Sequence, residues 1–215
     1  MNTQIINYIA MVVPILLSLT IHEYSHGYVA YRLGDTTARD SGRLTLNPLS
    51  HIDPIGLIML FIIGMGWAKP VPINLHAFAH PKRDLALSSA AGPASNFIVA
   101  AFTGLLFRIF PGLVPLTGDP VLILFLKLNL FYLLLINVGL GVFNLIPIPP
   151  LDGSKILRGF LPDSKVHIID HLERYGGIVL LSVVFLGRIS GFSVFGRLIG
   201  PVIYGIIHFF SGLTI

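Results

Sequence analysis

An H-E-x-x-H pattern occupies residues 22–26, where the chain reads His22-Glu23-Tyr24-Ser25-His26. Two residues four apart in a helix lie about one turn from each other on the same face, so both imidazoles can reach one metal ion. Glu23 follows the first histidine and can approach a water molecule at that ion without becoming a ligand. The pattern predicts a hydrolytic zinc site with His22 and His26 as ligands and Glu23 as general base.

The sequence around this pattern is strongly apolar. No charged side chain occurs between Met1 and Ile21, a stretch long enough to cross a bilayer. Over the 215 residues, 54% are hydrophobic and 11% are charged, whereas a soluble domain carries about 25% charged residues. Ionisable residues within a membrane span are costly and mark function by default. Packing alone is therefore the weaker explanation for two histidines and a glutamate in this position.

A catalytic zinc site usually has three protein ligands and one open position, so a third ligand is needed. Cysteine is absent, which leaves histidine, aspartate or glutamate. Asp152 is the candidate, in the sequence NLIPIPPLDG that runs from Asn144 to Gly153. Its three prolines break a helix and Gly153 permits a turn, so a carboxylate could enter the membrane region there. An aspartate that only caps a helix-ending turn remains the alternative. Asn144 could donate an amide hydrogen bond to the substrate or to the oxyanion.

Uncharged stretches mark the elements that must position these residues. Five candidate spans stand out: Ile5–Leu33, Leu85–Phe107, Pro120–Ile146, Tyr175–Leu186 and Val194–Leu213. Residues 54–68 are apolar but too short and too rich in glycine for a span, which favours a re-entrant element. The predicted fold class is an all-α polytopic membrane protein with about five to six transmembrane helices and a re-entrant segment near the active site.

The distribution of lysine and arginine predicts the orientation of the chain in the membrane. With the N-terminus outside, the external ends hold only Arg108, Lys127, Arg188 and Arg197, and the other ten basic residues lie inside. This bias places the zinc motif toward the cytosolic side. We expect one membrane protease domain over residues 1–215, with a catalytic core at about 5–159 and a C-terminal helical hairpin at about 175–213. The first span lacks a basic signal-peptide region before it and is expected to be retained.

The motifs together resemble the site-2 protease family of intramembrane zinc metalloproteases. HEYSH and NLIPIPPLDG match the family's H-E-x-x-H and N-x-x-P-x-x-x-L-D-G elements, and AGPASN at residues 91–96 matches A-G-P-x-x-N. Residues 42–70 resemble the connecting region of small bacterial members, so that most of residues 16–159 is covered. The resemblance implies one zinc ion bound by His22, His26 and Asp152, with Glu23 as catalytic base. The PDZ and CBS modules of many members are expected to be lacking.

The implied activity is hydrolysis of peptide bonds in membrane-embedded protein substrates, in regulated intramembrane proteolysis. The expected partners are a transmembrane protein substrate and the lipid bilayer, in the cell membrane of a prokaryote. Nucleic acid is not an expected partner, because the basic residues behind the net charge of +4 are scattered through loops. The oligomeric state stays open.

Two other functions account for the sequence less well than proteolysis. A membrane zinc transporter would need further ionisable residues across the membrane, and the external halves of the spans offer none. A catalytically idle membrane scaffold is disfavoured because every catalytic position is filled. Two further histidine pairs, His76 with His80 and His167 with His171, share the four-residue spacing. We expect neither to bind metal, since the first lacks an acid between its members and the second sits in a charged, solvated segment.

Overall fold

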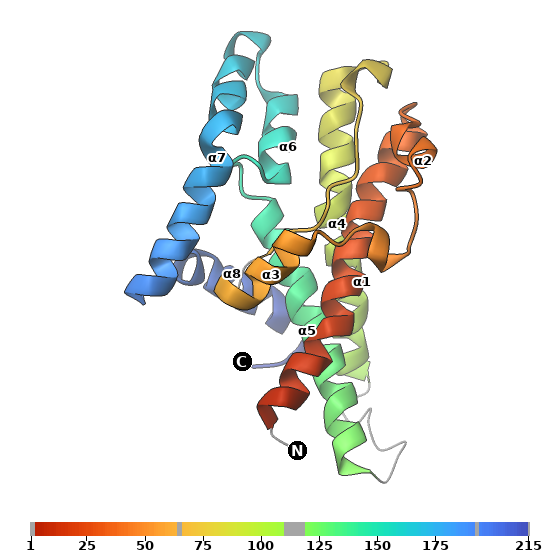
Figure 1. The fold of residues 1–215 in the computed structure, drawn as a ribbon. Helices are drawn as coiled ribbons and strands as arrows, with labels where there is room; N and C mark the ends of the chain where they lie inside the picture. Colours follow the sequence, from red (N-terminus) through yellow and green to blue (C-terminus); the bar gives the residue numbers. More distant parts are fainter. Residues whose placement is uncertain (1–2, 64–65, 110–118, 192–193, 215) are drawn as a thin grey trace.

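The computed structural model describes residues 3–63, 66–109, 119–191 and 194–214, and within these ranges its regular elements are helices (Figure 1). They are α1 (Thr3–Arg32), α2 (Thr37–Asp40), η1 (Pro48–Ser50), α3 (Pro54–Ile63), η2 (Leu75–Ala77), α4 (Pro81–Ile109), α5 (Pro120–Asn144), α6 (Asp152–Phe160), α7 (Asp163–Ser190) and α8 (Val194–Ser211). Among the described residues, strand-type pairing is limited to an isolated bridge between Ile52 and Ala68. The predicted all-α class is confirmed.

Helices α1, α4 and α5 form the centre of the molecule, and each contacts the other two (Figure 1). Helix α8 packs against α4 and α5, where Ile207 joins buried Ala100, Leu134 and Val138 in one apolar cluster. A Cβ at Gly104 of α4 would lie 2.6 Å from the Cβ of a phenylalanine in α8. The absence of a side chain at this glycine therefore allows the two helices to approach closely.

Within the described residues, three helices are long and apolar enough to cross a membrane: Ile5–Arg32, Pro81–Ile109 and Pro120–Asn144. They agree with the first three predicted spans. Their outward faces carry large exposed apolar side chains, such as Ile98 and Phe102, as lipid contact requires. The total of five to six spans remains a prediction. So does the division into a catalytic core and a C-terminal hairpin.

The connection between α1 and α4 returns along α1 and carries α3. This helix has ten residues, about 15 Å at 1.5 Å per residue, and cannot alone cross hydrocarbon about 30 Å thick. Beyond it, the Lys69 N–H donates to the His51 carbonyl (2.8 Å), and Arg43 donates to the Lys69 carbonyl (2.7 Å). The re-entrant path of residues 54–68 remains a prediction, and residues 64–65 lie outside the described ranges.

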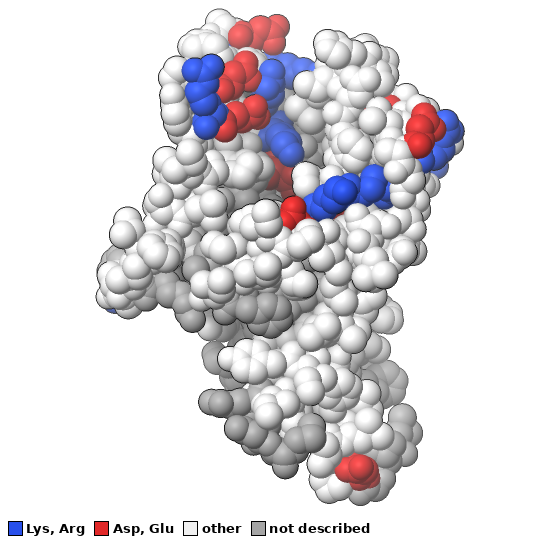
Figure 2. All heavy atoms as spheres, viewed as in Figure 1, with Lys and Arg blue, Asp and Glu red and all other residues white. Residues whose placement is uncertain are grey.

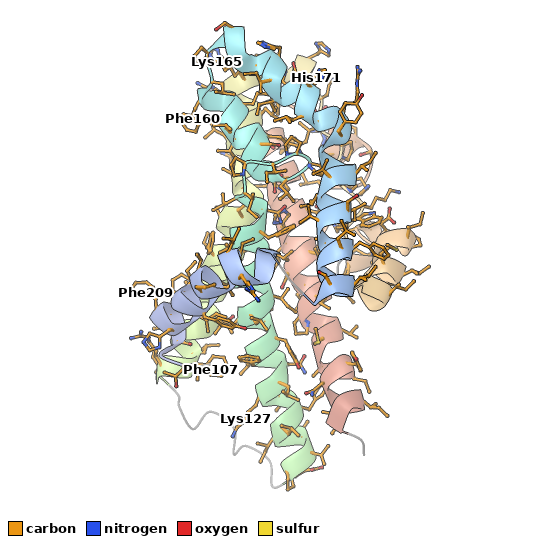
Figure 3. The ribbon with its side chains drawn as sticks, turned by 90° about the vertical axis from the view of Figure 1, so that its left-hand side faces the viewer. Phe107, Lys127, Phe160, Lys165, His171 and Phe209 are labelled. Carbon is orange, nitrogen blue, oxygen red and sulfur yellow. The ribbon has the colours of Figure 1, made fainter. Side chains whose placement is uncertain are left out.

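The C-terminal part differs from the predicted elements in one respect. Helix α7 is a single helix of 28 residues that joins the charged segment at 163–174 to the predicted span Tyr175–Leu186. In Figure 3, Lys165 and His171 near its start lie at one end of the molecule, and Lys127 of α5 lies toward the other end. Residues 110–118, between α4 and α5, lie outside the described residues.

Candidate metal centre

Helix α1 presents His22 and His26 on one face, as the four-residue spacing predicts. Their rings are perpendicular and their Nε2 atoms lie 3.0 Å apart. Both side chains are buried, with 5% and 6% of their residue surface exposed. The local helix geometry therefore brings two imidazole nitrogens to one point inside the bundle.

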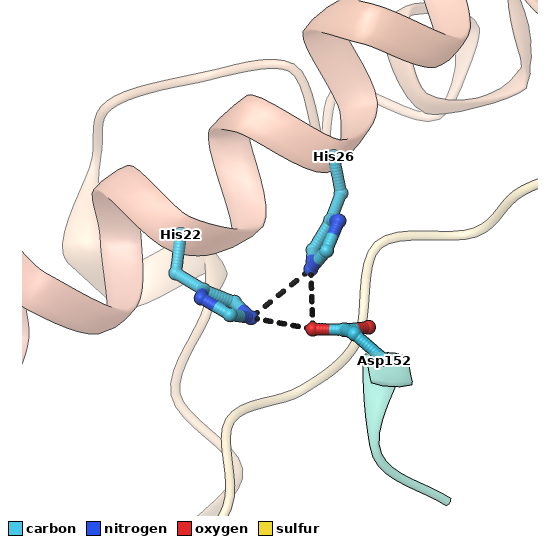
Figure 4. A group of neighbouring side chains, drawn as sticks. All are labelled: His22, His26 and Asp152. Carbon is cyan, nitrogen blue, oxygen red and sulfur yellow. Dashed lines mark hydrogen bonds and ion pairs between the residues drawn. The ribbon is translucent and has the colours of Figure 1, made fainter. Parts of the chain in front are cut away.

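Asp152 approaches this point from the opposite side, as the first residue of α6 (Figure 4). Helix α5 ends at Asn144, and the proline-rich segment after it turns the chain before α6 begins. A Cβ at Gly153 would collide with the carbonyl oxygens of Leu145 and Ile146, so glycine permits α6 to start this close to the end of α5. The turn is what delivers the Asp152 carboxylate to the histidines.

The three side chains form a compact triangle of ligand atoms. Asp152 Oδ2 lies 3.1 Å from His22 Nε2 and 3.2 Å from His26 Nε2 (Figure 4). Ligand atoms at zinc distances of about 2.0–2.2 Å in a tetrahedron are roughly 3.3–3.6 Å apart, a few tenths of an ångström more than the observed separations. Among the described residues, this is the one group of three or more histidine, aspartate or glutamate side chains with metal-binding spacing.

Two groups on helix α4 contact the Nδ1 atoms of the histidines, on the side of each ring away from the triangle. His26 Nδ1 lies 2.7 Å from the Ser88 carbonyl oxygen, which can only accept, so Nδ1 donates its proton there. His22 Nδ1 lies 2.6 Å from Asn96 Oδ1. With Nδ1 as the donor, each neutral imidazole presents its Nε2 lone pair toward the Asp152 carboxylate oxygen. Such a set of donors fits a divalent cation.

Gly92 lies on α4 where that helix faces the two imidazole rings. A Cβ there would collide with His26 Nε2 and would lie 2.7 Å from His22 Cε1. The glycine of the AGPASN motif is therefore needed for the histidine rings to reach their observed positions. The absence of a side chain at Gly92 thus lets α4 pack closely beside α1.

Glu23 lies beside the triangle but outside it. Its Oε2 accepts a hydrogen bond of 2.9 Å from the Val71 N–H, in the extended segment that follows α3. Glu23, Asn144 and the triangle line one cavity of about 140 Å³. Asn144 donates through Nδ2 to the Leu140 carbonyl at 3.1 Å. The structure thus brings all five residues singled out in the sequence to one place.

Some neighbours of this site were not found from the sequence. Val71 and Ser88 contact the predicted residues only through the fold, whereas Lys155 is a local neighbour whose Nζ lies 3.8 Å from Asp152 Oδ1. A main-chain N–H or carbonyl carries no sequence signal, because every residue but proline offers both. Lys155, three residues after Asp152 on one helix, could have been found from its spacing.

The other histidine pairs do not form such a group. His76, His80, His167 and His171 are all exposed. Among the described residues, no third ligand completes either pair.

Comparison with known proteins gives the family. Residues 123–186 match the model of peptidase family M50. A protein of Bacillus subtilis named "Putative zinc metalloprotease YwhC" is 39% identical over 191 residues, which cover 87% of this chain and 85% of that protein. The chain belongs to peptidase family M50, the site-2 protease family.

Other relatives are similar over shorter shares of their length. The protein of Mycolicibacterium smegmatis named "Putative zinc metalloprotease Rip2" is 30% identical over 179 residues, covering 81% of this chain and 66% of that protein. Protease RseP of Photorhabdus luminescens is 37% identical over 71 residues, 31% of each chain. No solved structure matches. This member of family M50 is a zinc metalloprotease and an integral membrane protein.

Proposed function

We propose that this protein is an intramembrane protease that cuts peptide bonds of membrane-embedded protein substrates in regulated intramembrane proteolysis. The observation that carries the proposal is a buried His22–His26–Asp152 triangle, with a carboxylate beside it, inside a bundle of apolar helices. His22 precedes the end of α1 at Arg32 by ten residues, about 15 Å along the helix. A site at this depth lies below the polar ends of the bundle.

The surface of the molecule supports this placement. Figure 2 shows lysine, arginine, aspartate and glutamate gathered toward one end, over α2, α6 and the start of α7, while the opposite half of this face is almost free of charge. The triangle lies between these two regions. A substrate that reaches it laterally would come from the apolar half, where a transmembrane segment would lie.

The roles of the residues follow from their contacts. His22, His26 and Asp152 would hold the zinc ion. When bound, zinc supplies a Lewis acid that polarises the scissile carbonyl and lowers the pKa of water. Glu23 accepts the proton of the attacking water and returns it to the departing amine. Asn144 has a second amide hydrogen beyond the one given to Leu140, and we assign it to the substrate carbonyl.

A helical substrate must change its conformation before it can be cut at this site. Peptide bonds in a helix are tied up in their own hydrogen bonds, so the substrate must unwind locally before it can be cut. The extended segment with Pro70, Val71 and Ile73 lines the same cavity as the triangle. A segment of this kind can hold an unwound peptide alongside it by main-chain hydrogen bonds.

The sidedness of the site follows from charge. The charged end, where α6 and the start of α7 lie, corresponds to the loops that hold most of the basic residues. We therefore assign this end to the cytosol and the membrane to the cell membrane of a prokaryote.

Glu23→Gln tests the chemistry. The change keeps the size of the side chain and removes its basicity, and general-base catalysis contributes about 10²- to 10⁴-fold. We expect cleavage of a membrane-embedded test peptide to fall by at least about 10²-fold, with zinc content and peptide binding retained. Glu173→Gln, at the exposed second glutamate of the chain, is the matched control and should cleave at the parent rate.

Two results would overturn the assignment. Cleavage by Glu23→Gln at the parent rate would show that the general base lies elsewhere. Loss of zinc together with activity would make Glu23 a ligand or a support of the ligands.

A further inference from the structure

Three polar side chains are fully buried in the middle of the helix bundle, away from the cavity. Ser18 of α1, Asn96 of α4 and Asn137 of α5 each have 0% of their surface exposed. Burying a polar group without a hydrogen-bond partner destabilises the folded protein. All three are hydrogen-bonded to one another, and the chain of bonds ends at His22.

The donors in this chain have a fixed direction. Asn137 Nδ2 donates to the Leu133 carbonyl (2.8 Å) and to Ser18 Oγ (2.7 Å), and Ser18 Oγ donates its own proton to the Pro14 carbonyl (2.7 Å). A main-chain carbonyl can only accept, so the orientation of the Asn137 amide is set. Its Oδ1 must then face the next member as an acceptor.

The same reasoning fixes the next amide. Asn96 Nδ2 donates to Asn137 Oδ1 (2.8 Å) and to the Ser18 carbonyl (3.3 Å). Turning the Asn96 amide over would set oxygen against oxygen at both contacts. Asn96 Oδ1 therefore faces His22 Nδ1 as an acceptor, at 2.6 Å, and His22 Nδ1 must carry the proton.

We propose that Asn96, held by Asn137 and Ser18, is a positioning residue that sets the tautomer and the direction of His22, so that Nε2 presents its lone pair to zinc. This inference rests on the proposed role of His22 as a ligand. The outer partner of a metal-binding histidine fixes the ring and raises its basicity. The hydrogen-bonded side chains of Ser18, Asn96 and Asn137 come one from each central helix. The orientation of His22 therefore depends on how α1, α4 and α5 pack together.

The two histidines differ in how they are held. His26 relies on the Ser88 carbonyl, a main-chain group that a side-chain substitution leaves in place. His22 relies on a side chain. The His22 half of the site can therefore be tuned by substitution at Asn96.

Asn96→Leu tests the inference, because leucine fills the space without an acceptor. Loss of an outer partner typically lowers metal affinity by about 10- to 100-fold, and we expect this loss in competition with a zinc chelator. Asn96→Asp keeps the acceptor oxygen for His22 but sets its second oxygen against Asn137 Oδ1 and the Ser18 carbonyl, so it should recover only part of the affinity. Thr103→Val is the matched control, since Thr103 is buried on the same helix and, among the described residues, its hydroxyl donates to the Val99 carbonyl one turn earlier. It should leave zinc affinity unchanged.

A second measurement needs no substitution at Asn96. In the zinc-bound parent protein labelled with ¹⁵N-histidine, His22 should show a proton on Nδ1 that is protected from exchange. Its signal is assigned by its absence in His22→Ala. A His22 without a proton on Nδ1 would overturn the inference, as would folded Asn96→Leu with the zinc affinity of the parent. If His22→Ala itself keeps the zinc affinity of the parent, the proposed ligand set fails, which is a separate outcome.

Discussion

The two sides of the metal centre are built differently. On the α4 side, His22 and His26 rest against Gly92 and are hydrogen-bonded to buried groups at Asn96 and Ser88. On the opposite side, Glu23 is held by one N–H of the segment after α3, and Glu23 and Asn144 are only partly buried. The rigid side would fix the ligands, and the open side would leave the base within reach of water and an unwound substrate. Substitutions can therefore affect zinc binding by His22 and His26 separately from proton transfer by Glu23.

Gly92→Ala should break the rigid side and have the largest effect. The added methyl group meets both imidazole rings, so the ligands must move, and a misplacement near 1 Å can cost about 10²-fold in rate. We expect both zinc affinity and cleavage to fall by about 10²-fold or more, measured by chelator competition and peptide cleavage.

Gly139→Ala is the matched control for this change. Gly139 lies inside α5 and a Cβ there meets nothing within 4 Å, so alanine should leave zinc binding intact and raise helix stability by up to about 1 kcal/mol. Normal zinc affinity in Gly92→Ala would show that α4 does not confine the histidines.

Val71→Pro should weaken the open side alone. Proline removes the N–H that donates to Glu23, in a segment that already holds Pro70 and Pro72. Because a hydrogen bond to a charged group contributes about 1.5–3 kcal/mol, we expect cleavage to fall by roughly 10-fold as Glu23 loses its orientation. Zinc content should not change.

Val71→Ala keeps the N–H and separates this effect from packing. It should retain more activity than Val71→Pro. Equal losses in the two variants would assign the effect to the Val71 side chain, and loss of zinc in Val71→Pro would mean that the two sides are not independent.

The smallest perturbation tests which end of the molecule faces the cytosol. Val121 and Lys165 are exposed, at the start of α5 and of α7, and the chain has no cysteine of its own. Figure 3 shows Lys165 at the end opposite the α5 residue Lys127. We expect Val121→Cys to react with an impermeant thiol reagent in intact cells and Lys165→Cys to react only after permeabilisation. The reverse pattern would place the charged end outside.

The sequence predicts the parts of this site that depend on local geometry. The spacing of His22 and His26 indicates a shared helix face, and the prolines before Asp152 indicate a turn, because both patterns act over a few residues. The partners Asn96 and Val71 could not be assigned, since they lie 74 and 48 residues from their contacts and meet them only through packing. For the same reason, the charged segment at 163–174 gave no sign that it continues into the following span as one helix.

Zinc content tests the central claim most directly, because every role assigned here depends on the triangle. We expect elemental analysis to find about one zinc per chain in the purified protein, and little in the double variant His22→Ala with Asp152→Ala. The double variant His167→Ala with His171→Ala removes an exposed pair of equal spacing and should keep its zinc. Zinc retained in the first variant and lost in the second would place the metal site on α7 and contradict the account.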